Sequence, residues 1–407
     1  MTTAARSGLS GVAGATVFSA ASGYLVLFIA ARSLGAERYD VFAVYWSAFF
    51  ALTGIVNGLM HESTRAVHAA LGSERPGGAR PAIVATVVGA AVALAVLLSA
   101  PAWAERLVPE HTGVGVGLLA AAIASFTLQA ALSGALSGAG RWGLYGALLT
   151  IDAALRLVVA LAAALLGLPE IGLLVATVCG SLTWLLLVAL SPACRDALRL
   201  RADVALRPFL SRVLQAMVAA SATAALVVGF PVLLKATAAA EDPRVLGGLI
   251  LAVTLTRAPL LVPLTSFQNA IVVYFADRRG ARSRALALPV AAVLGIAALG
   301  AAAAWLVGPP ILAFMGEGFD VPGVHLAGLT LASGTTAALF LSGAAALAHD
   351  RHGAYVLGWW AATIATLALL MLLPLDVTAR TIVALLAGPL LGLAWHAVAI
   401  AQRDGNR

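Results

Sequence analysis

Apolar runs long enough to cross a membrane follow one another along almost the whole chain. A helix needs roughly 20 mostly apolar residues to span the hydrocarbon core of a bilayer. Reading the runs between charged or Gly/Pro breaks gives twelve candidates, at 11–31, 41–60, 82–101, 113–136, 145–167, 170–190, 212–234, 246–274, 286–307, 325–347, 354–373 and 380–401. Only 11% of the residues are charged and the mean hydropathy is +0.98, whereas a soluble domain carries about a quarter. The sequence therefore predicts an all-α polytopic membrane protein with twelve transmembrane helices.

The basic residues are distributed unevenly between the two sides of these predicted spans. If the N-terminus is cytoplasmic, the outer segments hold only Arg32, Arg38, Arg106, Lys235, Arg244 and Arg380. The remaining arginines fall in inner segments, apart from Arg156 and Arg257 inside spans. Because cytoplasmic loops are enriched in Lys and Arg, we expect a multi-pass protein of the cell (plasma) membrane with both termini cytoplasmic. The net charge of +7 is then explained by loops facing anionic membrane lipids, and no nucleic acid partner is expected.

The longest polar break, at 191–212, divides the predicted spans into two sets of six. The loop "LSGALSGAGRWGLY" (132–145) is similar to "LSGAAALAHDRHGAY" (341–355), with Arg141 and Arg351 at equivalent places about 210 positions apart. An even number of spans gives both halves the same topology, so their pseudo-twofold axis would run along the membrane normal. We therefore predict an N-terminal lobe at 1–190, a cytoplasmic basic linker at 191–211 and a C-terminal lobe at 212–407, with a cleft between the lobes.

Four stretches resemble one family of membrane transporters. They are "ARSLGAERYDVFAVYWSAFFAL" (31–52), "GALSGAGRWGLYGALLTIDAALRLVVALAAALLG" (134–167), "GFPVLLKATAAAEDPRVLGGLILAVTLTRAPLLVPLTSFQNAIV" (229–272) and "LVGPPILAFMGEGFDVPGVHLAGLTLA" (306–332). They are similar to the polysaccharide exporters, or O-antigen flippase-like proteins, of the multidrug/oligosaccharidyl-lipid/polysaccharide (MOP) superfamily. The resemblance implies a twelve-helix, two-lobed flippase for lipid-linked glycans, with polysaccharide polymerase and glycosyltransferases as candidate partners. The lipid II flippase branch of this superfamily usually carries two further helices, which are not among the twelve spans predicted here.

The predicted span 246–274 contains an arginine near the middle of the membrane, where a charge costs roughly 2.5–3.5 kcal/mol on insertion scales. Arg257 lies eleven residues into the span, about 16 Å deep at 1.5 Å per residue. On a continuous helix Gln268 would lie about 20° from Arg257, with Thr254 and Thr265 on flanking angles. One side of this helix is therefore expected to be polar along its length.

Two prolines in the same span, Pro259 and Pro263, each remove a backbone donor and bend the helix. Bent helices with a polar face line cavities in transporters, so we predict that Arg257, Gln268 and Asn269 bind substrate. The alternative is a buried arginine that is satisfied by carbonyls freed at the prolines.

The predicted span 145–167 contains a second intramembrane pair, Asp152 and Arg156, in the favourable order for an ion pair four residues apart. If the pair faces the cleft, Arg156 and Arg257 offer one guanidinium from each lobe. Two such groups suit a pyrophosphate because each presents a bidentate fork of donors, so both arginines and Asp152 are predicted substrate-site residues. The alternative is a self-neutralised pair that only lowers the cost of insertion.

The ends of two spans supply predicted gates. In "VNGLMHESTRAV" (56–67), Asn57 is placed at the substrate site, and Glu62 and Arg65 lie at the cytoplasmic mouth. The resemblance to the exporters implies a cytoplasmic gate at "HESTR"; the alternative is an interfacial salt bridge. Lys235, at the outer end of the span 212–234, is the predicted extracytoplasmic gate; the alternative is an ordinary interfacial cation.

Three classes of membrane protein compete as interpretations of this sequence: an enzyme, a drug antiporter and a glycan flippase. A membrane glycosyltransferase needs a large outer loop with catalytic groups, whereas the predicted outer loops are short, so an enzyme is not expected. No P-loop, Rossmann fingerprint or nucleophile elbow is found, "HDRH" (349–352) lacks further ligands, and no cofactor or metal is expected.

A cation-coupled multidrug antiporter would need an exchangeable buried carboxylate, but Asp152 has an arginine neighbour. Mid-membrane arginines favour an anionic substrate, a polyprenyl-pyrophosphate oligosaccharide flipped by alternating access, with the antiporter as the alternative.

Overall fold

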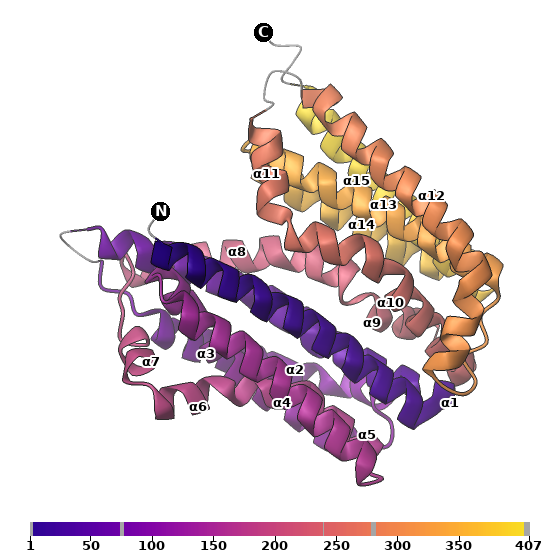
Figure 1. Ribbon diagram of the computed structural model, residues 1–407, viewed down its shortest axis with the longest axis horizontal. Helices are drawn as coiled ribbons and strands as arrows, with labels where there is room; N and C mark the ends of the chain where they lie inside the picture. The colour runs from indigo at the N-terminus through magenta and orange to yellow at the C-terminus, as the bar shows by residue number, and fades with distance from the viewer. Residues whose placement is uncertain (1–2, 74–76, 239, 278–281, 403–407) are drawn as a thin grey trace. The chain divides into compact units, whose positions relative to one another are not determined.

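In the computed structural model of the protein, the regular secondary structure of the described residues, 3–73, 77–238, 240–277 and 282–402, is all helical (Figure 1). Side chains are described from residue 11 onwards, without those of residues 266, 269 and 282–284. The helices are α1 (Thr3–Leu71), α2 (Pro81–Leu107), α3 (Thr112–Gly138), α4 (Trp142–Leu165), α5 (Pro169–Cys179), the 3-10 helix η1 (Gly180–Leu182), α6 (Thr183–Leu190), α7 (Pro192–Ala197), α8 (Leu206–Val227), α9 (Phe230–Thr237), α10 (Pro243–Ser266), α11 (Gln268–Ala276), α12 (Arg282–Met315), α13 (Gly323–Ala348), α14 (His352–Leu372) and α15 (Val377–Ala401).

Within the described residues, 11 helices are long and apolar enough to cross a membrane, as expected for a multi-pass membrane protein. The first of them, Gly11–Leu71, is 61 residues long and covers the first two predicted spans. It is broken at Gly35, whose φ of 65° and ψ of 175° are not helical. Glycine adopts this conformation without a steric penalty because it has no Cβ.

Contacts divide the chain into two compact units, at places that differ from the predicted lobe boundaries. The N-terminal unit consists of residues 1–34 and 44–224, and the C-terminal unit consists of residues 35–43 and 225–407. The predicted linker 191–211 and most of α8 thus belong to the N-terminal unit, whereas the segment 35–43, next to the break in α1, belongs to the C-terminal unit.

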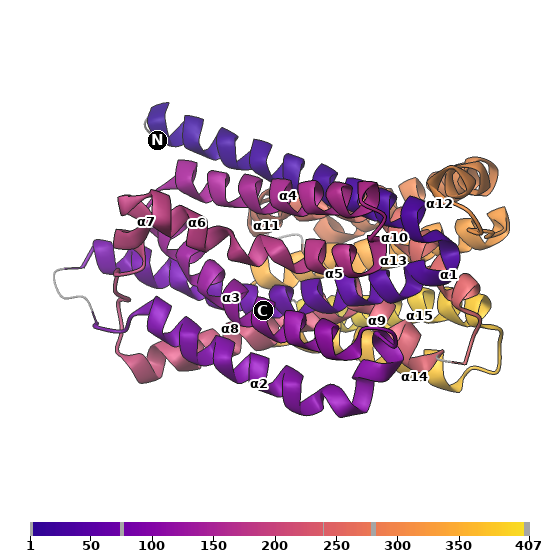
Figure 2. The same ribbon diagram turned by 90° about the horizontal axis from the view of Figure 1, so that it is seen from below.

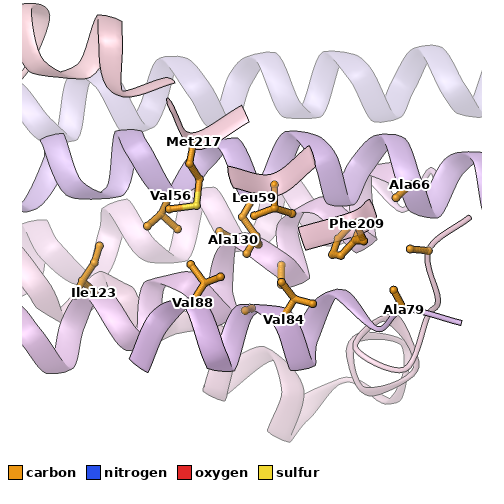
Figure 3. Close-up of a cluster of buried hydrophobic side chains, with 14 residues drawn as sticks. Val56, Leu59, Ala66, Ala79, Val84, Val88, Ile123, Ala130, Phe209 and Met217 are labelled. Atoms are coloured by element: carbon orange, nitrogen blue, oxygen red, sulfur yellow. The ribbon is translucent and has the colours of Figure 1, made fainter. Parts of the chain in front are cut away.

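The N-terminal unit has an apolar core between α1, α2, α3 and α8. Its side chains include Leu59 from α1, Val84 from α2, Ala130 from α3 and Phe209 from α8, all buried (Figure 3). Gly58 of α1 lies so close to the backbone of α8 that a Cβ there would be 2.4–2.7 Å from its atoms. Small residues at such crossings let helices approach closely, which drives packing between membrane helices.

Backbone hydrogen bonds join the linker to the turn before α2. Gly77 donates to the carbonyl of Ala202, Ala202 donates to Ala79, and Asp203 donates to Ala66 at the end of α1. A polar connection is expected to satisfy its backbone in this way when it is packed rather than solvated. The linker is therefore an ordered part of the N-terminal unit.

The C-terminal unit is built around α13. In the most apolar 18-residue stretch of α13, 83% of the residues are buried, compared with 17–61% in the other spans of this unit. The helix packs against α10, α11, α12, α14 and α15 (Figure 2). The segment 35–43 joins this unit through a hydrogen bond of 3.1 Å from Ala36 N to Glu317 O and an edge-to-face contact between Tyr39 and Phe319.

Three predicted spans are interrupted in the structure, which corrects their expected continuity. The span 170–190 passes through η1, 212–234 is broken between α8 and α9, and 246–274 is broken at Phe267 between α10 and α11. The last break follows Pro263 by four residues, and Phe267 is in the sparsely populated bridge region at φ −100° and ψ 14°. Periodicity could not locate these breaks because apolar residues continue on both sides of each one.

The two similar loops found in the sequence form the same turn. Arg141 N donates to Leu136 O at 2.8 Å, and Arg351 N donates to Ala346 O at 2.9 Å. The preceding residues, Gly140 (φ 69°) and Asp350 (φ 59°), both have left-handed backbone conformations. The 210-residue correspondence predicted from sequence therefore holds at the level of these turns.

Candidate functional site

Arg257 is buried in α10 and bonds to the end of another helix rather than to a carboxylate. Its Nη1 donates to the carbonyls of Leu226 and Val227, at 3.3 and 3.1 Å. These two residues end α8, where carbonyls have no intrahelical partner and carry partial negative charge. The guanidinium carbon also lies 4.9 Å from the ring centre of Phe230, a cation–π distance.

These contacts satisfy only part of the hydrogen-bonding capacity of the guanidinium. Arg257 is 6% exposed, and its Nη2 is buried without a hydrogen-bond partner in the described part of the chain. The carbonyls used are those at the end of α8, and not those freed at the prolines as in the alternative interpretation. The result is a buried cation that is held in place by carbonyls, with no ion pair to a carboxylate in the part of the chain that the structure describes.

The rest of the predicted polar stripe is less continuous. Thr254 and Thr265 each donate their hydroxyl back to a carbonyl one turn earlier in α10. Gln268 is half-buried and begins the separate helix α11, so the 20° alignment expected on one straight helix does not apply. The side chain of Asn269 lies outside the described residues.

A cavity of about 330 Å³ lies between α10, α12 and α13. Its lining is almost entirely apolar and includes Leu255 and Pro259 of α10, but not Arg257. Pro259 therefore adjoins an apolar cavity, and Arg257 lies on another side of the helix.

Asp152 and Arg156 form the intrahelical pair that the spacing predicted, inside the N-terminal unit. Arg156 Nε lies 2.5 Å from Asp152 Oδ1, and its Nη1 donates to the carbonyl of Thr177 in α5. The guanidinium carbon lies 5.1 and 5.0 Å from the ring centres of Phe49 and Phe50. Arg156 is therefore enclosed by a carboxylate, a carbonyl and two aromatic rings.

The other oxygen of Asp152 is also engaged. Gln129 of α3 donates from Nε2 to Oδ2 at 2.8 Å, and its own carbonyl oxygen accepts from Trp184 N at 3.3 Å. Gly180 packs on the pair so closely that a Cβ would lie 1.9 Å from Asp152 Oδ1. We call Gln129, Asp152, Arg156 and Gly180 the N-unit polar cluster; its formal charges cancel.

The predicted cytoplasmic gate residues form a larger network than the sequence indicated. Arg65 donates Nε and Nη2 to Glu62, at 2.8 and 2.6 Å, and also donates to both carboxylate oxygens of Asp203, at 2.9 and 3.0 Å. Arg212 lies 3.8 Å from the same carboxylate. These hydrogen bonds from Arg65 hold the pKa of Asp203 below its ordinary value. Asn57 is half-buried on α1, more than one turn before Glu62.

Lys235, the predicted extracytoplasmic gate, is paired with a buried carboxylate of the C-terminal unit. Its Nζ donates to Oδ2 of Asp40, which is fully buried, while the Lys235 side chain is 11% exposed. Asp40 Oδ1 is buried without a hydrogen-bond partner among the described residues. A second pair, Arg244 with Glu37 at 3.1 Å, joins the same segment to α10 but is exposed.

The structure thus distributes the predicted site residues over separate clusters. Asp152 and Arg156 lie together, as do Glu62 and Arg65, whereas Arg257 and Lys235 belong to the C-terminal unit. Sequence reasoning missed their partners, namely Gln129, Asp203, Asp40, Phe49, Phe50 and Phe230. Only Gln129 gave a usable signal, as a lone amide inside an apolar span.

Two comparisons with known sequences bear on the identity of the chain. It is 44% identical over 396 residues to an uncharacterized protein of Mycobacterium bovis, covering 96% of this chain and 91% of the relative. It is also 42% identical over 402 residues to an uncharacterized protein of Mycobacterium tuberculosis, covering 98% and 93%. No model of a protein family matches the chain.

Solved structures with a similar fold are transporters. An inward-facing multidrug-resistance MATE-family transporter of the MOP superfamily has a TM-score of 0.73 and 13% identity, covering 96% of both chains. Its outward-facing counterpart has a TM-score of 0.64, also at 13% identity, covering 99% of this chain and 97% of that one. A MOP-superfamily transporter from Pyrococcus furiosus, whose description states that a reversed polarity of its binding pocket suggests a different function, has a TM-score of 0.65 at 13% identity, covering 98% and 97%. The chain therefore belongs to the same family as these mycobacterial proteins, and it has the fold of the MOP-superfamily transporters.

Proposed function

We propose that this protein flips a lipid-linked oligosaccharide, a glycan on polyprenyl pyrophosphate, across the cytoplasmic membrane by alternating access. In this proposal the chain crosses the membrane twelve times, with α1 counting as two spans on either side of Gly35 and with both termini in the cytoplasm. The polar head would enter a cleft between the lobes while the polyprenyl tail stays in lipid. This lowers the cost of moving sugar hydroxyls through hydrocarbon, several kcal/mol for each unsatisfied group.

The proposal rests mainly on the buried and incompletely bonded guanidinium of Arg257. Its positive charge is buried in α10, its Nη2 has no hydrogen-bond partner among the described residues, and the rest of the group bonds to helix-end carbonyls and lies over an aromatic ring. Ionisable groups inside membrane segments are costly and mark sites that interact with substrates or ions. An unneutralised guanidinium favours an anion, and its planar fork matches the oxygens of a phosphate.

The surrounding residues take supporting roles in this proposal. Arg156 and Asp152 would bind or orient the head group from the N-terminal lobe, with Asn57, Gln268 and Asn269 as further polar lining. Glu62 and Arg65 would close the cytoplasmic side and Lys235 the outer side. Each of these assignments is testable by the same transport measurement.

The alternative is a cation-coupled multidrug antiporter, which the MATE-family transporters of similar fold favour. Such a mechanism needs a carboxylate that can bind a cation in one state and release it in the other. In the N-unit polar cluster both oxygens of Asp152 are already occupied by Arg156 and Gln129, which disfavours this role for Asp152 in the conformation described here.

The test is transport of a lipid-linked oligosaccharide by the full-length protein in proteoliposomes, scored by the fraction of glycan accessible to an external glycosidase. We expect Arg257→Ala to lower the initial rate by about 100-fold or more, since a charged hydrogen bond to substrate is worth about 1.5–3 kcal/mol and its charge adds to this. Arg257→Lys should restore transport only partly, because lysine keeps the charge but not the fork.

Arg244→Gln is the matched control, since it removes an exposed arginine from the same helix. Its transport should equal that of the unmodified protein. Full glycan transport by Arg257→Ala would rule out the site. Efflux of a cationic dye that depends on Asp152, without any glycan transport, would establish the antiporter instead.

A further inference from the structure

Two turns of the N-terminal unit bring three metal-binding side chains together on the side that is predicted to face outwards. Glu110 and His111 lie between α2 and α3, and Glu170 lies in the first turn of α5. One carboxylate or imidazole atom from each lies within 4.8 Å of the other two. Helix periodicity could not indicate this grouping, because the two turns are about 60 residues apart.

Both turns are fixed by local contacts. Thr112 Oγ1 donates to Val108 O at 2.7 Å, Val108 is buried, and Gly115 N donates to His111 O at 2.8 Å. Tyr45 of α1 donates its hydroxyl to Gly115 O at 3.1 Å, which ties this end of α3 to α1.

On the other side, Gly167 turns the chain with a φ of 69° and Pro169 begins α5. Glu170 thereby lies at a helix N-terminus, where a carboxylate is favoured. The three ligand atoms are thus presented by ordered backbone and not by long, free loops.

The spacing of the ligand atoms fits a metal better than a hydrogen bond. His111 Nε2 and Glu170 Oε2 are 3.6 Å apart, longer than a good N–H···O bond. Two ligands of a tetrahedral zinc ion with bonds of about 2.0–2.2 Å lie roughly 3.4 Å from each other. Imidazole nitrogen favours zinc and similar transition metals over Mg²⁺ or Ca²⁺, and carboxylates complete such sets.

We propose that Glu110, His111 and Glu170 bind one Zn²⁺ ion and leave its fourth position open to water. The ion would join the α2–α3 turn to the α4–α5 turn and so hold the outer ends of two helix hairpins together. This site is separate from the buried charges of the proposed transport function and does not depend on it.

The test is a titration of the purified, chelator-stripped full-length protein with Zn²⁺ alone, and with Co²⁺ as a spectroscopic probe of coordination. We expect one ion per chain, a Co²⁺ spectrum of low coordination number and a rise in thermal midpoint with added Zn²⁺. Glu110→Gln, His111→Gln and Glu170→Gln should each weaken Zn²⁺ binding by about 100-fold, because even second-shell changes cost about 10–100-fold in metal affinity.

Glu105→Gln is the matched control, since Glu105 is an exposed carboxylate in α2 a few residues before the site. It should leave the affinity unchanged. The exposed Glu110→Gln change tests the site even if His111→Gln impairs folding. The proposal is overturned by equal Zn²⁺ binding in the unmodified protein and the three variants, by the absence of saturable binding, or by full competition from millimolar Mg²⁺.

Discussion

Gln129 Nε2 donates a 2.8 Å hydrogen bond to Asp152 Oδ2, while Asp152 Oδ1 accepts a 2.5 Å bond from Arg156. One carboxylate therefore binds a cation on its own helix, α4, and an amide on the preceding helix, α3. Because the two oxygens have different partners, the N-unit polar cluster fixes α3 against α4 as well as neutralising Arg156.

Removing Asp152 alone should be worse than removing the whole ion pair. Asp152→Asn leaves Arg156 buried with no counter-charge, and breaking a buried pair in this way costs about 3–5 kcal/mol. Asp152→Asn combined with Arg156→Gln should recover at least half of that loss. Thermal unfolding of the two single variants and the double variant in detergent, compared as a double-mutant cycle, measures the coupling between the two side chains. Additive losses of stability would show that Asp152 and Arg156 are not coupled.

Gly180→Ala should disrupt the same cluster without changing any charge. The added Cβ would lie 1.9 Å from Asp152 Oδ1 and 2.5 Å from Arg156 Nε, so the pair or η1 must move. We expect a loss of at least about 1–3 kcal/mol, the usual cost of overpacking. Gly117→Ala is the control, because its Cβ would meet nothing within 4 Å; similar losses in both variants would refute the steric argument.

The two ion pairs that join the segment 35–43 to the C-terminal unit should differ greatly in importance. Lys235→Met leaves the fully buried Asp40 without a counter-charge, so we expect a loss of about 3–5 kcal/mol. Arg244→Gln removes an exposed pair and should cost within about 1 kcal/mol. Thermal midpoints of the two variants give the comparison, and equal midpoints would contradict it.

The cytoplasmic network should make stability depend on pH through Asp203. Its pKa is lowered from the ordinary 3.8 by hydrogen bonds from Arg65, so the ionised carboxylate stabilises the folded protein. That contribution is fully present above the ordinary pKa and is lost as the pH falls through the lowered one. Asp203→Asn should lower the thermal midpoint at pH 7, and the difference from the unmodified protein should shrink below pH 4. A difference in thermal midpoint that stays constant down to pH 2.5 would argue against this dependence on Asp203 ionisation. The change in stability should be modest, because the Arg65 side chain is 42% exposed and solvent screens the pair.

The predicted orientation can be tested with single cysteines. Cys179 and Cys194 are both buried, so an impermeant maleimide should give little background. Gly72→Cys is expected to react only from the cytoplasmic side, and Asp320→Cys only from the outer side. The reverse pattern would place both termini outside.

Composition and apolar run length determined the class of this protein, because a chain with so few charges cannot cover a soluble surface. The uneven placement of arginines gave a testable orientation, and the repeated loop predicted two matching turns. The Asp152–Arg156 pair was also predictable, since residues four apart on a helix must face the same side.

Tertiary structure decided which charges have partners. Gln129, Asp203 and Asp40 lie 23, 138 and 195 positions from the residues that they bond, and helix periodicity carries no information on contacts at such separations. The breaks at Phe267 and between α8 and α9 were also not visible in the sequence, because apolar residues continue on both sides of each one. Sequence alone therefore placed Arg257 inside a predicted span. Only the fold brought the Arg257 guanidinium against the carbonyls that end α8, with no carboxylate paired to it among the described residues. This contact could not be predicted because it depends on how two helices meet.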